Sequence, residues 1–221
     1  MPLPSIPAYA LDAHPAAVNR TAWTLEPARA MLLIHDLQNH FVDAFDRTPS
    51  SQITLAIAAT ANLASACRAA NVPIVYTAQP PAQHAADRRL LTDFWGTGLA
   101  TPAAAAIIDE LAPKPDDIVL TKWRYSAFHR TDLLDRLRNH DRDQLIITGV
   151  YSHIGCLTTA LNAFMHDIKV FFVADAQADF SAADHQMALD YVGTRCGQVT
   201  VSAEVLDALA RVRPMSGAVK V

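Results

Sequence analysis

The sequence lacks the features of a secreted or membrane protein. No apolar run approaches the roughly 20 residues that a helix needs to cross a bilayer. The opening segment MPLPSIPAYALDAHP has no basic residue before its apolar positions, so it does not predict a signal peptide. Cysteine is scarce: Cys67, Cys156 and Cys196 form an odd, widely spaced set, which favours reduced, buried thiols over a disulfide framework. We therefore expect a cytoplasmic protein with no membrane partner.

The sequence also has no excess of positive charge and no metal-binding motif. Eighteen Lys and Arg residues face 22 Asp and Glu residues, for a net charge of −4, which gives no support for a nucleic-acid partner. There are nine histidines, but no H-x-H, H-E-x-x-H or C-x-x-C pattern. No G-x-G-x-x-G or Walker motif follows an expected strand. We therefore expect no metal and no cofactor.

What the sequence does have is an alternation of short apolar runs and helical segments. Its 221 residues, 51% of them hydrophobic, suit one globular domain. The expected strands are 30–36, 74–78, 118–122, 144–150, 170–174 and 199–202. The expected helices are 55–71, 102–111, 132–140, 155–167, 182–195 and 204–211. This alternation predicts an α/β fold of three layers (α/β/α), with a six-stranded parallel sheet in the order 3-2-1-4-5-6.

The chain divides into three expected parts. Residues 1–28 are rich in proline and are expected to form an N-terminal arm over the domain surface. The domain itself is expected at 29–212, followed by a C-terminal tail at 213–221. Within the domain, 79–101 reads as a long loop with one helical turn, and a loop of this length is usually functional.

Asp36 follows the first expected strand, and the carboxyl ends of parallel strands are where α/β proteins place their chemistry. The predicted strand order brings Asp36, Gln79, Lys122 and 151–155 around one crevice. Asp36 can instead simply end the strand by accepting hydrogen bonds from turn amides. As a functional group, it has two opposing influences: apolar walls raise its pKa and make it an acid, whereas a nearby lysine favours the carboxylate. The sequence leaves that balance open.

Five further residues each have a functional and a structural interpretation. Lys122 could meet Asp36 or reach water from a strand end. Arg88 could clamp a carboxylate or be a solvated loop residue. Gly155 could let a ligand approach helix amides or merely give clearance. His153 could be a base or a capping group. Cys156 could be a nucleophile or a buried core residue.

Six motifs together resemble the isochorismatase-like hydrolases over about residues 20–208. They are HDLQNHF at 35–41, YTAQP at 76–80, DFWGTG at 93–98, TKWRYSAFHR at 121–130, GVYSHIGC at 149–156 and VADAQADFS at 173–181. In the amidase branch of this family, an Asp–Lys–Cys triad matches Asp36 and Lys122, but its cysteine falls on Gly155. Cys156 is one residue late, and the metal-binding D-x-H of nicotinamidases is missing after Phe41. The chain therefore looks like a true isochorismatase.

The resemblance implies hydrolysis of the enolpyruvyl vinyl ether of isochorismate, giving pyruvate and 2,3-dihydro-2,3-dihydroxybenzoate. Asp36 would protonate the vinyl carbon as general acid, and Lys122 and Arg88 would neutralise the two carboxylates of the substrate. Gln79, Tyr151 and the Gly155 amide would orient them. Aromatic walls would exclude water: Phe41, Trp95 and Tyr125. A glycine at position 155 would open room for the substrate ring where a cysteine would attack.

Three alternatives remain open from the sequence. The same chemistry could act on 2-amino-2-deoxyisochorismate in a phenazine pathway instead of isochorismate in a siderophore pathway. The chain could be a cysteine amidohydrolase working through Cys156. It could also be a non-catalytic module that docks a carrier protein. The resemblance further implies a homodimer, and a stand-alone domain because the chain ends at Val221 before any carrier domain.

Overall fold

The computed structural model describes residues 3–10 and 19–211. Within these residues, six strands form one sheet. The strands are β1 (Ala30–His35), β2 (Ile74–Ala78), β3 (Ile118–Thr121), β4 (Gln144–Val150), β5 (Lys169–Ala178) and β6 (Gln198–Thr200). Every strand pairs in parallel with its neighbours, and the order across the sheet is β3-β2-β1-β4-β5-β6. The predicted sheet and its order are thus confirmed.

Helices connect the strands. The α-helices are α1 (Asn39–Val42), α2 (Gln52–Ala69), α3 (Ala85–Arg88), α4 (Leu91–Trp95), α5 (Pro102–Ala105), α6 (Leu133–Asn139), α7 (Leu157–Met165), α8 (Ala182–Arg195) and α9 (Ser202–Ala210). Short turns of other helix types are η1 (Pro27–Arg29), η2 (Asp109–Leu111) and η3 (Ser152–Cys156), the last a π-helical turn. In the described part of the chain, no helix is both long and apolar enough to cross a membrane.

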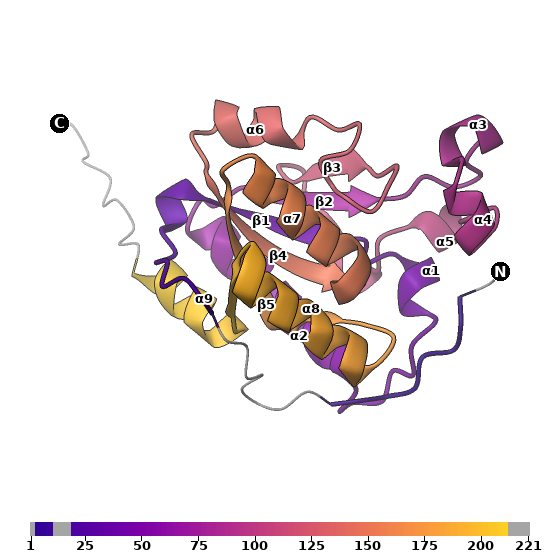
Figure 1. The fold of residues 1–221 in the computed structure, drawn as a ribbon, viewed down its shortest axis with the longest axis horizontal. Helices are drawn as coiled ribbons and strands as arrows, with labels where there is room; N and C mark the ends of the chain where they lie inside the picture. Colours follow the sequence, from indigo (N-terminus) through magenta and orange to yellow (C-terminus); the bar gives the residue numbers. More distant parts are fainter. Residues whose placement is uncertain (1–2, 11–18, 212–221) are drawn as a thin grey trace.

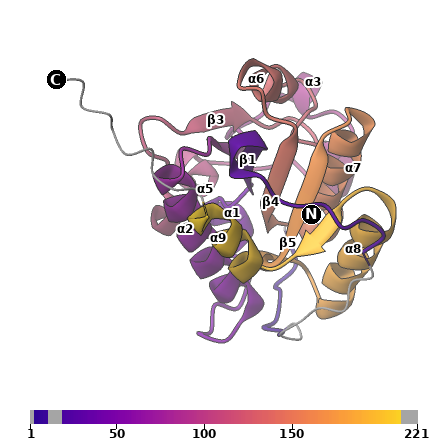
Figure 2. The same ribbon diagram turned by 90° about the vertical axis from the view of Figure 1, so that its left-hand side faces the viewer.

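The sheet lies between two layers of helices (Figures 1 and 2). Side chains of α2 and α9 pack on one face, and those of α6, α7 and α8 pack on the other. Because both faces are covered, β1 is buried at every position, as a central parallel strand should be. Successive β1 side chains alternate between the faces: Leu32 and Ile34 join the α2 side, whereas Met31 and Leu33 join the α7 side.

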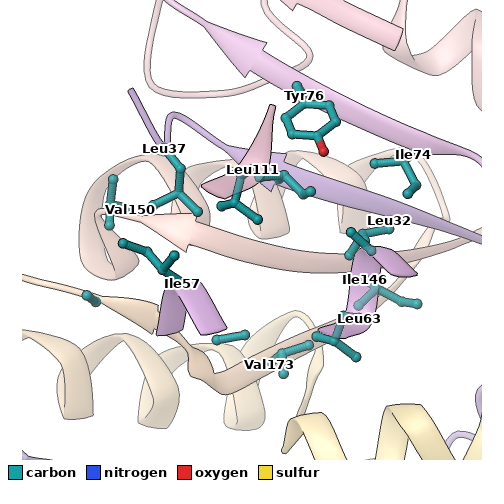
Figure 3. Close-up of a cluster of buried hydrophobic side chains, with 14 of the residues drawn as sticks. Leu32, Leu37, Ile57, Leu63, Ile74, Tyr76, Leu111, Ile146, Val150 and Val173 are labelled. Atoms are coloured by element: carbon teal, nitrogen blue, oxygen red, sulfur yellow. The ribbon is translucent and has the colours of Figure 1, made fainter. Parts of the chain in front are cut away.

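The α2 side of the core explains why this Ala-rich segment folds as a helix. Ile53, Ile57 and Ala64 are buried at helical spacing, so one face of α2 meets the sheet. In Figure 3, Ile57 and Leu63 of α2 lie among side chains of the strands. The helix ends at Ala69, and Asn71, two residues later, has a left-handed φ of 55°, a conformation that asparagine tolerates after a helix end.

Two expected elements differ through a contact with a distant segment, and a third, the loop expected at 79–101 with one helical turn, contains two short helices, α3 and α4. The single helix expected at 102–111 is wrong: α5 and η2 are separated because Ile107 bridges antiparallel to Gln38 and takes the chain out of the helix. The fifth strand is longer than expected, since pairing with β4 resumes at Gln177 and Ala178 after an irregularity. In both cases the cause is a contact with a distant segment.

The described part of the expected N-terminal arm contacts the domain at several points. Ile6 is buried and bridges in parallel to Phe45, and the Tyr9 hydroxyl accepts a hydrogen bond from the Asp179 amide at 2.7 Å. The arm and domain boundaries at residues 28 and 212 stay predictions. The expected tail at 213–221 lies outside the described residues.

The start of α8 gives a test of local stability. Ser181 accepts a hydrogen bond from the Asp184 amide at 3.1 Å and donates one to its carboxylate at 2.6 Å, so it caps the helix as expected from the sequence. Ser181→Ala should lower the free energy of unfolding by about 1 kcal/mol in urea denaturation. Thr194→Ala is the control, because the Thr194 hydroxyl bonds only within the exposed end of α8; it should change stability by less than about 0.5 kcal/mol. Equal effects of the two changes would contradict the capping role.

Candidate active site

Asp36 lies immediately after β1, between the ends of β2 and β4. Its φ of 50° is left-handed, a conformation that aspartate adopts more readily than most residues and that turns the chain sharply at the strand end. The order in which strands are added reverses here: β2 and β3 lie on one side of β1, and β4, β5 and β6 lie on the other. Such a switch point is where open α/β sheets bind ligands. The side chain is nevertheless nearly inaccessible, at 4% exposure.

Two side chains bind the Asp36 carboxylate. Lys122 Nζ donates to Oδ2 at 2.6 Å, and Thr77 Oγ1 donates to Oδ1 at 2.6 Å. Lys122 follows β3 and is only 2% exposed. The structure therefore brings Asp36 and Lys122 together as a buried ion pair, and the interpretation of Lys122 as a strand-end residue reaching water is wrong.

The same contacts set the protonation of Asp36. Burial raises its pKa, but the positive charge of Lys122 and the hydrogen bonds from Lys122 and Thr77 outweigh burial, so the pKa lies below its ordinary value. Of the two opposing influences that the sequence left open, the lysine therefore prevails over the apolar walls in this structure. Any role as an acid requires something that weakens the hold of Lys122.

A cavity opens beside this ion pair, with an empty volume of about 420 Å³ including its mouth. Eight of the nine predicted site residues line it. The lining residues are Leu3, His35, Asp36, Phe41, Gln79, Trp95, Lys122, Tyr125, Val150, Tyr151, Ile154 and Gly155. The walls are largely aromatic and aliphatic with a few polar groups, as is usual for ligand sites.

Hydrogen bonds to the main chain and between side chains fix the walls. The buried Gln38 amide donates to the Gln79 carbonyl at 2.9 Å and accepts from the Gln79 N–H at 2.8 Å, which holds Gln79 at the end of β2. The Trp95 indole donates to the Tyr125 hydroxyl at 2.9 Å. The Tyr151 hydroxyl donates to a main-chain carbonyl, that of Phe41, at 3.2 Å.

Arg88 is the predicted site residue that does not line the cavity. It is 4% exposed, so the interpretation as a solvated loop arginine is wrong. Its guanidinium donates to the Gly96 carbonyl at 2.5 Å and to the Gln83 side chain at 3.1 Å. Arg88 thus holds the segment that carries Trp95, and its contact with a substrate stays a prediction.

The turn after β4 carries Gly155 and Cys156. A Cβ built on Gly155 would lie 2.2 Å from Cε1 of His35, so the space beside the glycine is filled by an imidazole. The expectation that Gly155 opens room for a substrate ring is therefore wrong for that direction. Cys156 is fully buried, and burial raises its thiol pKa well above the ordinary value. The structure thus favours the core interpretation of Cys156, and the cysteine nucleophile is not supported.

His153 behaves as a structural group. Its Nδ1 lies 2.6 Å from Oδ1 of the fully buried Asp179, and its amide donates to the same carboxylate. This agrees with the capping interpretation. Within residues 3–10 and 19–211, no three His, Cys, Asp or Glu side chains are grouped as metal ligands would be.

Sequence reasoning missed His35, Leu3 and Thr77. Thr77 and His35 are buried within strands that are buried along all or nearly all of their length, where an apolar run gives no signal of which side chain faces the site. Leu3 reaches the cavity from the N-terminal arm, about 30 residues before Asp36, and no local pattern could have placed it there. Only the position of His35 directly before Asp36 was visible as a clue.

The fold and the site together define a doubly wound α/β protein with a buried Asp–Lys pair at its topological switch point. Residues 30–204 match the family model of the isochorismatase domain. The chain is 53% identical over 211 residues to an isochorismatase of Bacillus subtilis, covering 95% of this chain and 67% of that protein. It is 47% identical over 207 residues to phenazine biosynthesis protein PhzD1 of Pseudomonas aeruginosa, covering 93% and 99% respectively. The chain belongs to the isochorismatase family.

A solved structure agrees with this assignment. The structure of a cysteine hydrolase from Pseudomonas syringae pv. phaseolicola superposes with a TM-score of 0.78 at 27% sequence identity. The match covers 87% of this chain and 97% of the other. The parallel sheet with order 3-2-1-4-5-6 is thus common to proteins that differ in most of their residues.

The ion pair makes a prediction about stability and pH. In the native protein, the lowered pKa of Asp36 means that its contribution is complete above the unfolded value of about 3.9 and is lost as the pH falls through the folded pKa. Lys122→Met removes the cation and leaves a buried carboxyl whose pKa burial raises. The variant should lose about 3–5 kcal/mol at pH 7.

The direction in which the free energy of unfolding changes with pH shows whether the buried Asp36 carboxyl causes the loss of stability. For Lys122→Met, the free energy of unfolding should fall as the pH rises between about 3.9 and the raised folded pKa, because only the unfolded state ionises freely there. The double variant Asp36→Asn, Lys122→Met has no such carboxyl and should lack that slope. Urea denaturation across pH 4–8 measures all three proteins. A Lys122→Met protein with the native pH profile would contradict the coupling.

Proposed function

We propose that this protein hydrolyses the enolpyruvyl vinyl ether of isochorismate to pyruvate and 2,3-dihydro-2,3-dihydroxybenzoate. The observation that carries the proposal is the buried Asp36–Lys122 pair in a cavity whose walls include no cysteine. The 53% identity to an isochorismatase supports it independently. A site that has a carboxyl group but no cysteine nucleophile is better suited to protonate a carbon atom than to form an acyl-enzyme.

The mechanism begins when a carboxylate of the substrate binds Lys122. A substrate carboxylate competes with Asp36 for the ammonium group, and each unit by which the Asp36 pKa then rises corresponds to about 1.4 kcal/mol. Burial, which already favours the neutral acid, becomes the dominant influence on Asp36. Asp36 then takes up a proton from solvent, so binding of the dianionic substrate creates the acid that acts on it.

Proton transfer and water addition complete the reaction. Asp36 donates its proton to the methylene carbon, which leaves an oxocarbenium ion at the adjacent carbon. Water adds to that carbon and returns a proton to the Asp36 carboxylate. The resulting hemiketal collapses: its hydroxyl loses a proton to become the ketone of pyruvate, and the oxygen attached to the ring takes up a proton and leaves as the ring hydroxyl. No covalent enzyme intermediate and no metal is part of this scheme.

The remaining walls have supporting parts in the proposal. Gln79, Tyr151 and the Gly155 amide orient the substrate, and Phe41, Trp95 and Tyr125 keep bulk water out. Restricted access of water strengthens the interaction of Lys122 with an anion. Arg88 is proposed to neutralise the second carboxylate of the substrate. Its guanidinium donates a hydrogen bond to the main-chain carbonyl of Gly96.

A second candidate substrate is 2-amino-2-deoxyisochorismate, in phenazine biosynthesis. The supporting observation is the 47% identity to phenazine biosynthesis protein PhzD1 of Pseudomonas aeruginosa, set beside the identity to the Bacillus isochorismatase. The higher identity to the latter, 53% against 47%, favours isochorismate and a siderophore pathway. The ratio of kcat/KM for the two substrates decides between them. We also propose a homodimer and a cytoplasmic location, on family resemblance.

Turnover in heavy water tests the chemistry. With isochorismate and a chelator in D₂O, trapped pyruvate should carry one deuterium in its methyl group, because the proton comes from Asp36 in exchange with solvent. Asp36→Asn should reduce kcat by about 10²–10⁴-fold, the usual contribution of a general acid. Lactate dehydrogenase coupling measures the rate, and mass spectrometry measures the label.

Cys156→Ala is the matched control, since this thiol is buried away from the cavity. It should retain turnover, whereas a cysteine amidohydrolase would lose it. A protein that binds a carrier but releases no pyruvate from either substrate would instead be a docking module. Near-native turnover by Asp36→Asn would rule out the mechanism.

A further inference from the structure

His35 is a buried wall residue that the proposed mechanism does not use. It is inaccessible to solvent and lies between Asp36 and the turn that carries Gly155. Its Nδ1 lies 2.8 Å from the Val150 carbonyl, and its Nε2 lies 3.3 Å from the Tyr125 carbonyl. The imidazole therefore lies between the end of β4 and the segment after β3, two parts of the cavity wall that are distant in sequence.

The ring also occupies the space that a side chain at position 155 would need. The three heavy atoms nearest to a Cβ built on Gly155 all belong to His35: Cε1 at 2.2 Å, Nε2 at 2.9 Å and Nδ1 at 3.1 Å. Such separations are far below van der Waals contact. The ring cannot turn away cheaply, because both nitrogens face main-chain carbonyls and its surroundings are close-packed.

The backbone gives no other reason for glycine at this position. The glycines with positive φ among the described residues are Gly96, Gly98 and Gly149, so Gly155 has an ordinary backbone conformation. Gly149 is the contrast: its φ is 111°, and a Cβ there would lie 2.1 Å from the main-chain oxygen of His35. At position 155, the obstacle is one side chain.

We propose that His35 is a specificity-determining residue, because its ring takes the place of a side chain at position 155 and so keeps a nucleophile out of the site. It is at the same time a positioning residue for the Val150 segment of the wall, through the contact of its Nδ1 with the Val150 carbonyl. The consequence for catalysis rests on the proposed vinyl ether hydrolysis. The steric part does not depend on that function.

The charge state of His35 suits this role. Burial and the positive charge of Lys122 lower its pKa to about 4, so the ring is neutral at physiological pH. A neutral imidazole has one N–H, and the shorter contact assigns it to Nδ1, donating to the Val150 carbonyl. A neutral ring beside Asp36 and Lys122 fills volume without adding a third charge to the pair.

A comparison of position 155 in two backgrounds tests the steric claim. Gly155→Ala in the native background should lower Tm by about 3–10 °C, as expected for overpacking in a protein of this size. In a His35→Asn background, the same Gly155→Ala change should lower Tm by less than about 1 °C, because the smaller side chain leaves room for Cβ. His35→Ala is the second background, should His35→Asn not fold.

His185→Ala provides the matched control background. His185 is as buried as His35 but contacts Tyr9, so its removal should not relieve the cost of Gly155→Ala. An equal cost of the added Cβ in the native and His35-substituted backgrounds would overturn the proposal. So would an equal relief by His185→Ala.

A thiol probe gives a readout at the site itself. The three native cysteines are buried, so the native protein should react slowly with iodoacetamide. The thiol introduced by Gly155→Cys should be alkylated at least tenfold faster when combined with His35→Asn than alone, as measured by intact mass. His35→Asn, which keeps an N–H for the Val150 carbonyl, should also retain at least tenfold more turnover than His35→Ala.

The turnover assays test the proposed function, and the Tm and alkylation experiments test the role of His35, so one proposal can be wrong while the other holds. If the native protein does not hydrolyse isochorismate, the proposed function is wrong, while the Tm and alkylation results still decide the role of the ring. If turnover is as proposed but the thiol reacts equally in both backgrounds, the inference about His35 is wrong and the function stands.

Discussion

The buried ion pair between Asp36 and Lys122 is the interaction on which the rest of this site depends. Each charge costs several kcal/mol to remove from water, and the pair recovers this only with close geometry and additional hydrogen bonds. Here the distance is 2.6 Å, and Thr77 binds the second carboxylate oxygen. The fold supplies that geometry: the two charged residues follow β1 and β3, on strands separated only by β2, which carries Thr77. A rigid parallel sheet holds all three.

The same pair makes the site responsive to an anion. Burial and Lys122 act on Asp36 in opposite directions, and in the protein alone Lys122 prevails. A dianionic ligand weakens only one of these influences, since it shares the ammonium group but leaves the apolar surroundings intact. A site with Lys122 exposed to water would not respond to an anion in this way, because solvent screening would make the effect of the lysine on the Asp36 pKa small. In the proposed mechanism, burial of Lys122 is therefore a functional requirement and not only a consequence of packing.

The sequence predicted the strands and their order because long-range alternation of apolar runs and helices leaves few topologies. It predicted the meeting of Asp36, Gln79 and Lys122 for the same reason: strand ends converge at the switch point. It could not predict which of two opposing influences sets the Asp36 pKa. It also could not predict that Arg88 is buried and bound to the main-chain carbonyl of Gly96. Those outcomes depend on contacts of a few ångströms between distant segments, as does the contribution of Leu3 to the wall.

Gly155 shows how such contacts change the meaning of a motif. From the sequence, a glycine where relatives of the amidase branch carry cysteine looked like added space for a substrate. In the structure that space belongs to the ring of His35, the residue directly before Asp36 in the sequence. The absence of a nucleophile is thus not a property of position 155 alone. Because the ring and a side chain at 155 exclude each other, the residue before the acid and the residue at the helix turn act as one determinant of the chemistry.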